Sequence, residues 1–282
     1  MKVAIQYSGH LRFIQDTYPK IKEWFIANEE IEFYFIIHTW DESLPEDIEY
    51  MKNVIKPARY FIDKQKNFER HPYQLMNVAM THEEYKNEPT RLEWNRTHPN
   101  DQKRFFEKPS EENNYAFDKD LEVFKCDYYS HYPFNTLSLF YSMHQVSVLT
   151  NSFAQENNIT FDFVVRMRSD LHMQMSLQLN NLDKERLYLF DAAPHRGEQG
   201  KYTVHDQFAI SNPSIMTIYN DIFVYLPCYY AIVKLDWISE ILMGFHLQYN
   251  NIPIIKIPRY YTLLRYADRV NPQDGVIRRP TK

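Results

Sequence analysis

Apolar and polar positions recur with two periods along the chain, and together these periods predict an α/β fold. Short apolar runs with β-branched or aromatic residues predict strands at residues 3–7, 31–38, 57–62, 186–190 and 252–257. Apolar residues at three- and four-residue steps predict helices at residues 17–27, 46–55, 134–157, 215–226 and 237–249. Strands that alternate with helices indicate an open, mixed and mostly parallel sheet flanked by helices, a Rossmann-like three-layer sandwich.

The stretch at residues 161–172, FDFVVRMRSDLH, joins an apolar run to a charged one. Residues 163–165 show no polar alternation, which predicts a central strand buried on both faces. Open α/β sheets bind their ligands at the carboxyl ends of the strands. The side chains expected there are Arg166, Arg168, Asp170 and His172. They favour an anionic substrate held with a divalent metal ion, and a core strand with a solvated exit turn is the alternative.

Small polar and aromatic residues also follow the first two predicted strands. Ser8 and Gly9 end the first, and Gly9 would let the backbone approach a ligand. Arg12 suits a phosphate contact or a solvated helix entrance. His38 and Trp40 end the second strand, where Trp40 would stack on a base or plug the end of the sheet. The glycines form neither a Walker loop nor a full dinucleotide fingerprint.

Residues 205–210, HDQFAI, form a second stretch with residue types that could take part in binding or catalysis. Asp206 opens a strand-like run and suits a carboxylate that accepts a hydroxyl proton or binds a sugar, with a surface turn as the alternative. Ser211 or Asn212 can cap the next helix, and Pro213 suits its first turn. His246 lies late in a predicted helix, where we expect a helix-end cation.

The chain is expected to form one domain, residues 1–268, with an insertion or lid at 63–120. That region is rich in Asn, Glu, Lys, His and Pro and has no sustained period, which is unusual inside a compact domain. Residues 260–266 look extended, and residues 269–282 look like a polar, mobile tail.

Charge and composition narrow the class of protein. A net charge of −5 without a dense basic run argues against a nucleic-acid partner. Two isolated cysteines, Cys126 and Cys228, predict neither a disulfide framework nor a zinc site. No signal peptide begins the chain, and charges interrupt its most apolar window, 223–245. We therefore expect a cytoplasmic protein without a transmembrane segment, for which peripheral membrane contact stays open.

These motifs, in this order, resemble the GT-A glycosyltransferases of capsule and lipopolysaccharide biosynthesis and of large DNA viruses. The resemblance rests on residues 3–12 (VAIQYSGHLR), 35–40 (FIIHTW), 140–143 (FYSM), 162–171 (DFVVRMRSDL), 206–210 (DQFAI) and 254–265. It covers most of the chain outside 63–120. It implies a GT-A fold and the transfer of a sugar from a nucleotide-diphosphate donor to a glycan, a lipid-linked glycan or another hydroxyl acceptor.

The resemblance also implies roles for single residues. GT-A enzymes hold a divalent metal on the donor diphosphate through an Asp-x-Asp element, which here resembles Arg168-Ser169-Asp170, with arginine at the first position. It implies Asp170 and His172 as ligands of Mn²⁺ or Mg²⁺, and Asp206 and Asp170 as catalytic residues. The implied donor-binding residues are Tyr7, Ser8, Gly9, Arg12, His38, Trp40, Arg166 and Arg168.

Two other functions remain open at this stage. The incomplete Asp-x-Asp element would also suit a GT-A-like protein that binds a nucleotide sugar or glycan without turning it over. A sugar nucleotidyltransferase uses a similar sheet and metal, but residues 8–11 make a poor glycine-rich phosphate loop.

Overall fold

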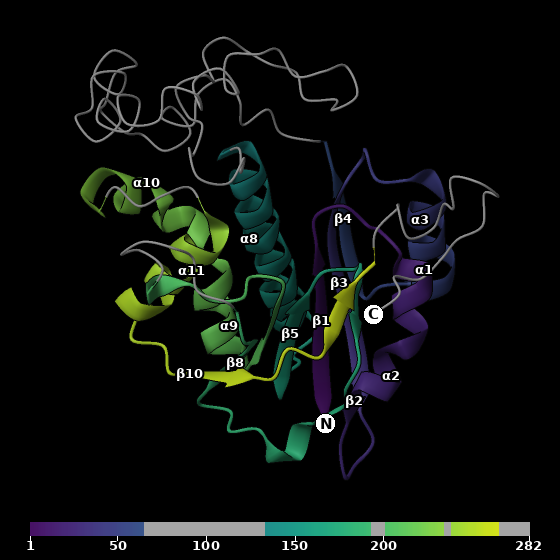
Figure 1. Cartoon of the computed structure of the whole chain (residues 1–282). Coiled ribbons are helices and arrows are strands. Elements are labelled where there is room, and N and C mark those ends of the chain that lie inside the picture. Colours follow the sequence, from purple (N-terminus) through teal and green to yellow (C-terminus); the bar gives the residue numbers. More distant parts are fainter. Residues whose placement is uncertain (65–132, 193–200, 234–237, 265–282) are drawn as a thin grey trace, which may run out of the picture.

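Seven strands form the main sheet, in the order β10-β8-β9-β5-β1-β3-β4 (Figure 1). The computed structural model describes residues 1–64, 133–192, 201–233 and 238–264. The strands are β1 (Lys2–Ser8), β3 (Glu32–Trp40), β4 (Arg59–Asp63), β5 (Phe163–Met167), β8 (Leu187–Phe190), β9 (Phe208–Ser211) and β10 (Ile254–Ile257). Only β9 among them runs antiparallel to its neighbours, β5 and β8. The predicted mixed, mostly parallel sheet is confirmed.

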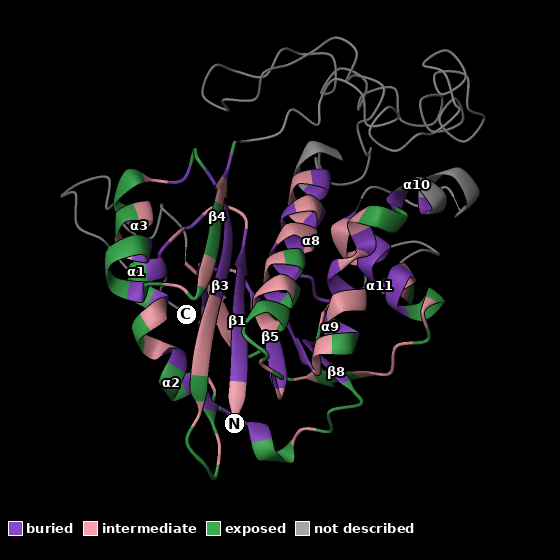
Figure 2. Ribbon diagram, turned by 180° about the vertical axis from the view of Figure 1, so that it is seen from behind, coloured by how far each residue is buried: buried purple, intermediate pink, exposed green. Residues whose placement is uncertain are grey.

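Helices cover both faces of this sheet, as the alternation of strands and helices predicts (Figures 1 and 2). One face carries α1 (Ile14–Thr17), η1 (Tyr18–Lys20), α2 (Ile21–Trp24), α3 (Pro45–Tyr50) and η2 (Met51–Ile55). The other carries α8 (Pro133–Glu156), α9 (Pro213–Asn220), α10 (Ile222–Val233) and α11 (Ser239–Tyr249). No helix in the described ranges has the length and apolar character that a membrane span requires.

Two short pairings complete the described structure. β6 (Leu171–Met173) pairs with β11 (Tyr261–Leu263), and β2 (Phe25–Ile26) pairs with β7 (Leu177–Gln178), which leads into η5 (Leu179–Asn181). Because β6 follows β5 directly, the pairing with β11 brings the C-terminal segment back to the exit of the central strand.

Side chains of β1 alternate between two hydrophobic cores, one on each face of the sheet. Val3, Ile5 and Tyr7 pack in the core that α1 and α2 cover, and Ala4 packs in the core that α8 and α9 cover. All five positions of β5 are buried, and β5 is the middle strand of the seven. The predicted central strand is therefore confirmed.

The register aligns the carboxyl ends of the first strands. Ser8 of β1 lies beside His38 of β3, and Tyr7 lies beside Met167 of β5. The loops after β1 and β5 consequently leave the sheet at the same edge.

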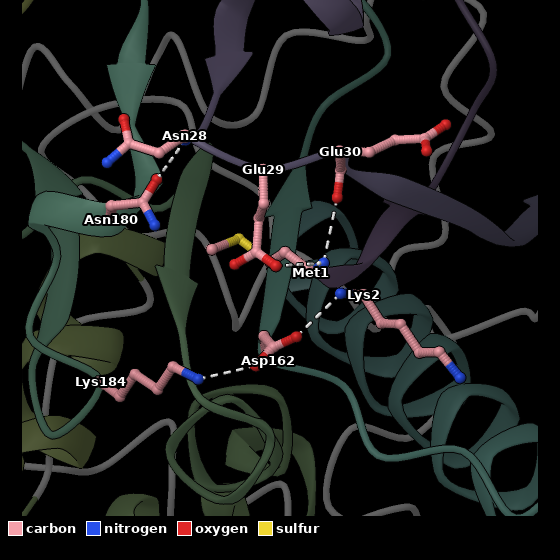
Figure 3. A network of polar contacts seen from close by, with 8 residues as sticks. All are labelled: Met1, Lys2, Asn28, Glu29, Glu30, Asp162, Asn180 and Lys184. Atoms are coloured by element: carbon pink, nitrogen blue, oxygen red, sulfur yellow. Dashed lines mark hydrogen bonds and ion pairs between the residues drawn. The ribbon is translucent and has the colours of Figure 1, made fainter.

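A polar network ties the strands at the opposite, amino edge (Figure 3). Asp162 accepts hydrogen bonds from the Lys2 backbone N–H and from Lys184 Nζ, both at 2.8 Å. The Met1 amino nitrogen donates to the Glu30 carbonyl at 3.0 Å. Partial burial acts to raise the pKa of Asp162, but the hydrogen bonds from Lys184 and Lys2 outweigh it and hold the pKa below its ordinary value.

Several predicted boundaries were wrong, for local reasons. The helix predicted over 17–27 is broken into α1, η1 and α2, because Pro19 lies in a 3₁₀ turn and Phe25 leaves the helix to pair with Leu177. The helix predicted over 215–226 breaks at Asp221 into α9 and α10. The start of that segment is confirmed, since Asn212 caps α9 through the Ile215 N–H and Pro213 occupies its first turn.

His246 is not a helix-end cation. Its side chain is fully buried, Nε2 donates to the Ile218 carbonyl at 2.7 Å, and Tyr229 OH donates to Nδ1 at 2.6 Å. Burial lowers its pKa, so the ring is neutral at pH 7.

Some expectations fall outside the described residues. The insertion expected at 63–120 lies there apart from its first two residues, as does the tail at 269–282.

Candidate functional site

Hydrogen bonds join the loop after β1 to the turn after β5 at the carboxyl edge of the sheet. The Arg12 backbone N–H donates to Ser169 Oγ at 2.9 Å, and Ser169 Oγ donates to the His10 carbonyl at 3.3 Å. Thr17 Oγ1 donates to the Ser169 carbonyl at 2.7 Å. Two of the predicted strand ends are thus held against one another.

Gly9 lets the β1 loop turn at this edge. Its φ of 96° is a conformation that L side chains rarely adopt, and its N–H donates to the His38 carbonyl at 3.2 Å. A Cβ on Gly9 would meet no atom within 4 Å, so the glycine is required by backbone conformation rather than by crowding.

Arg168 and Asp170 form a bidentate ion pair within the turn after β5. Arg168 Nε donates to Asp170 Oδ1 at 2.8 Å, and Nη2 donates to Oδ2 at 2.7 Å. The Asp170 side chain is 3% exposed, whereas that of Arg168 is 30% exposed. Burial acts to lower the pKa of Arg168, but the bonds to Asp170 outweigh it and raise the pKa.

Arg166 lies inside β5 and does not emerge from its end as predicted. The strand continues to Met167, so the Arg166 side chain is completely buried beneath Tyr219 of α9. Nε donates to Ser8 Oγ at 3.2 Å, and Nη1 donates to the Asp206 carbonyl. Nη2 has no hydrogen-bond partner among the described residues. Arg166 therefore links the end of β1 to the backbone of the second predicted stretch.

Asp206 lies beside this pair of arginines. The Arg168 N–H donates to the Gln207 carbonyl at 3.1 Å, which fixes the segment before β9 against the exit of β5. Asp206 is 6% exposed, and its charge acts on Arg166, Arg168 and Tyr261. The charges of the two carboxylates predicted to be catalytic, Asp170 and Asp206, therefore both act on Arg168, and Asp170 is the one hydrogen-bonded to it.

Three further residues complete the cluster, and none of them was singled out from the sequence. The Gln207 N–H donates to His205 Nδ1 at 3.3 Å, so Nε2 carries the proton and donates to Tyr261 OH at 2.5 Å. Burial lowers the pKa of His205 to about 4, despite the opposing charge of Asp206. The Arg259 guanidinium lies 5.3 Å from the centroid of the Tyr261 ring.

The local sequence contains little indication that His205, Tyr261 and Arg259 belong to the site. His205 precedes Asp206 directly, which was the one available hint. Tyr261 reaches the site because β11 pairs with β6, and that long-range pairing is invisible to a local period.

Tyr7, His38 and Trp40 lie in the cores rather than in this cluster. Tyr7 stacks on Phe35 on the face that α1 and α2 cover, and burial raises its pKa. β3 continues to Trp40, two residues further than predicted, and His38 Nδ1 lies 2.7 Å from Ser142 Oγ of α8. Trp40 is 1% exposed and stacks on Tyr141, as a plug at the end of the sheet would.

The residues present do not fit a divalent metal ion. Both oxygens of Asp170 accept hydrogen bonds from Arg168, and the ring of His172 packs edge-on against Trp24 at 5.4 Å. Within the described ranges no three His, Cys, Asp or Glu side chains are grouped as metal ligands would be. Mn²⁺ and Mg²⁺ need several oxygen ligands, so no chemical step below is routed through a metal.

Comparison with known proteins does not assign this chain to a family. No protein-family model matches the chain, and no curated protein sequence matches it significantly. A function therefore has to be inferred from the residues gathered at the carboxyl edge of the sheet.

Proposed function

We propose that this protein is a GT-A-type glycosyltransferase that moves a sugar from a nucleoside-diphosphate donor to a hydroxyl group of a glycan or lipid-linked acceptor. The observation that carries the proposal is that Asp206 lies at the carboxyl edge of a mostly parallel sheet, where Arg166 donates to its backbone carbonyl and the Arg168 N–H donates to the next carbonyl, that of Gln207. Ligands of open α/β sheets bind at this edge.

The arginine side chains suit the departure of the diphosphate, and the aspartate suits the attack of the acceptor hydroxyl. As the bond between the sugar and the diphosphate breaks, its electron pair leaves with the β-phosphate, and N–H donors fixed at that phosphate stabilise the growing charge. Arg168 is placed to donate, since its side chain is partly exposed at this edge. The acceptor oxygen bonds to the sugar carbon, and the Asp206 carboxylate takes its proton if the reaction inverts the anomeric centre.

The GT-A form of the proposal draws support from two further features. The sheet is mixed and mostly parallel, and the arginine-aspartate turn follows its central strand, where the resemblance expects a donor diphosphate. The two isolated cysteines favour a reducing compartment, so we place the reaction in the cytoplasm.

The test combines donor binding with transfer. A ligand that binds only the folded state raises its apparent stability, so a thermal-shift screen of nucleotide sugars identifies the donor. Asp206→Asn should keep the donor-induced shift and lose sugar transfer by about 100-fold or more, because the base is removed while the arginines remain. Asp191→Asn, at an exposed aspartate just after β8, is the matched control and should transfer at the normal rate.

Two results would contradict this proposal. A fully active Asp206→Asn variant would remove Asp206 from the mechanism. Release of pyrophosphate from a nucleoside triphosphate and a sugar phosphate would instead indicate a nucleotidyltransferase.

A second candidate is a protein that binds a nucleotide sugar or glycan without turning it over. The engagement of both Asp170 oxygens by Arg168 favours it, because the catalytic metal that the resemblance implies then lacks its ligand. A donor-induced thermal shift without hydrolysis, and without transfer to any of a panel of acceptors, would support this candidate.

A further inference from the structure

We propose that arginine side chains, and not a divalent metal ion, neutralise the diphosphate of the donor, and that Asp170 is the fixed counter-ion of Arg168. The inference rests on the proposed function, because it concerns the donor of that reaction. It follows from the hydrogen bonds that Arg168 makes to Asp170 and from the N–H donors of Arg168 that these bonds leave over.

Asp170 is poorly placed to bind a metal ion. Its two oxygens each accept a charge-assisted hydrogen bond from Arg168, and the carboxylate is almost fully buried. A metal ion would have to displace these bonds and lie beside the guanidinium charge, which would repel it. The turn is also held by hydrogen bonds from Ser169 to His10 and from Thr17 to Ser169, so it does not swing freely.

Arg168 keeps donors to spare while Asp170 holds it. A guanidinium carries five N–H donors, and the bonds from Nε and Nη2 to Asp170 use two of them. Three therefore remain without a partner among the described residues, on a side chain that is 30% exposed. Phosphate oxygens are the acceptors that match this planar set of donors, and they are themselves anionic.

The charges around Arg168 favour an anion. Arg259 is exposed beside Tyr261 and acts electrostatically on His205, and Arg166 is buried and bound to the Asp206 backbone. The cluster therefore holds three arginines and two carboxylates, Asp170 and Asp206, and burial keeps His205 neutral at pH 7. These described side chains together carry a net positive charge, in a chain whose overall charge is −5.

Binding of uridine diphosphate and inorganic pyrophosphate, measured by calorimetry with EDTA and with excess Mn²⁺, tests the proposal. At least one probe should bind in EDTA, with an affinity within about threefold of that in Mn²⁺. Arg168→Gln should weaken this binding by about tenfold or more, since a charge-assisted contact contributes about 1.5–3 kcal/mol. Arg259→Gln, at an exposed position, should weaken it by a smaller factor and keeps the test valid if Arg168→Gln fails to fold.

Asp170→Asn separates the two roles of this carboxylate. As a counter-ion, it is replaceable, because an amide oxygen still accepts from Arg168, and probe binding in EDTA should persist. As a metal ligand, it is not replaceable, and any Mn²⁺-dependent binding should vanish. Thermal unfolding without ligand shows whether the variant is folded.

The outcomes also separate this inference from the proposed function. Sugar transfer that requires Mn²⁺ and is lost in Asp170→Asn would overturn the inference and leave the glycosyltransferase intact. Probe binding in EDTA without transfer of any sugar would support the anion site and count against the enzyme. No binding of either probe, with or without Mn²⁺, would also overturn the inference.

Discussion

Arg166 and Arg168 lie two positions apart and have different environments because β5 ends between them. Arg166 is inside the strand and completely buried, with its guanidinium bound to Ser8 and to the Asp206 backbone. Arg168 lies beyond the strand and is partly exposed. The first therefore acts as a positioning residue for the loops, and the second is the one that can meet a ligand.

Replacing Arg166 by lysine should destabilise the protein by about 2 kcal/mol. An ammonium group cannot match the planar fork that reaches both Ser8 Oγ and the Asp206 carbonyl, so a buried acceptor loses its donor. Arg59→Lys is the matched control, because Arg59 pairs with Glu156 at the surface, where the ion pair is screened by solvent, and should change stability much less. Urea unfolding measures both, and equal losses would contradict the positioning role.

Local sequence identified some residues of the cluster and misplaced others. Arg168 and Asp170 were identified from charges that follow an apolar run and Asp206 from its place at the start of one, and all three lie near the exit of β5. Tyr7, His38 and Trp40 were expected beside them, but a run of residues does not show where a strand ends or which face a side chain takes. β3 continues to Trp40, which buries His38 and Trp40 against α8.

At the scale of elements, α11 supports the segment that carries Asp206. The Val204 N–H donates to the Glu240 carbonyl at 3.3 Å, and a Cβ on Gly244 would lie 1.5 Å from the Tyr202 carbonyl oxygen. The helix and the chain at residues 202–204 are therefore in backbone contact. A glycine inside a helix costs stability by itself, so this close approach explains its presence.

Gly244→Ala should destabilise the protein by about 1–3 kcal/mol, although alanine is the better helix former. The added methyl group must push α11 away from Tyr202, and the shift should also reduce sugar transfer by disturbing Asp206. Gln248→Ala, at an exposed position of the same helix, should change stability by less than about 0.5 kcal/mol. A stabilised Gly244→Ala variant would show that the helix tolerates the displacement.

Element types were easier to predict than their contacts. α8 was predicted to within one residue at each end, because a long and strongly periodic segment carries a clear local signal. The start of β5 was predicted correctly, but the strand ends two residues later than predicted. The pairing of β6 with β11 carries none, since it joins residues about ninety positions apart. Arg259 and Tyr261 were missed for that reason.

At the scale of the whole molecule, folding removes two histidine side chains from water. His205 is 5% exposed and His246 is fully buried. Burial lowers the pKa of both, to about 4 for His205. In the unfolded chain both rings would titrate near the ordinary value of about 6.5. Between these pKa values the unfolded state binds more protons than the native state, so stability must fall as the pH falls.

Thermal and urea unfolding between pH 7 and pH 5 should show this loss, of roughly 2 kcal/mol from His205 alone for a pKa shifted from 6.5 to about 4. His205→Gln keeps a group that can hydrogen-bond to Tyr261 and cannot be protonated, so its stability should depend less on pH. Gln248→Ala, at an exposed position of α11, removes no titratable group, so it is the control and should keep the slope of the parent protein. An unchanged slope in His205→Gln would mean that the ring admits a proton in the folded state, and a cationic His205 would then add its charge to the arginines around Asp206.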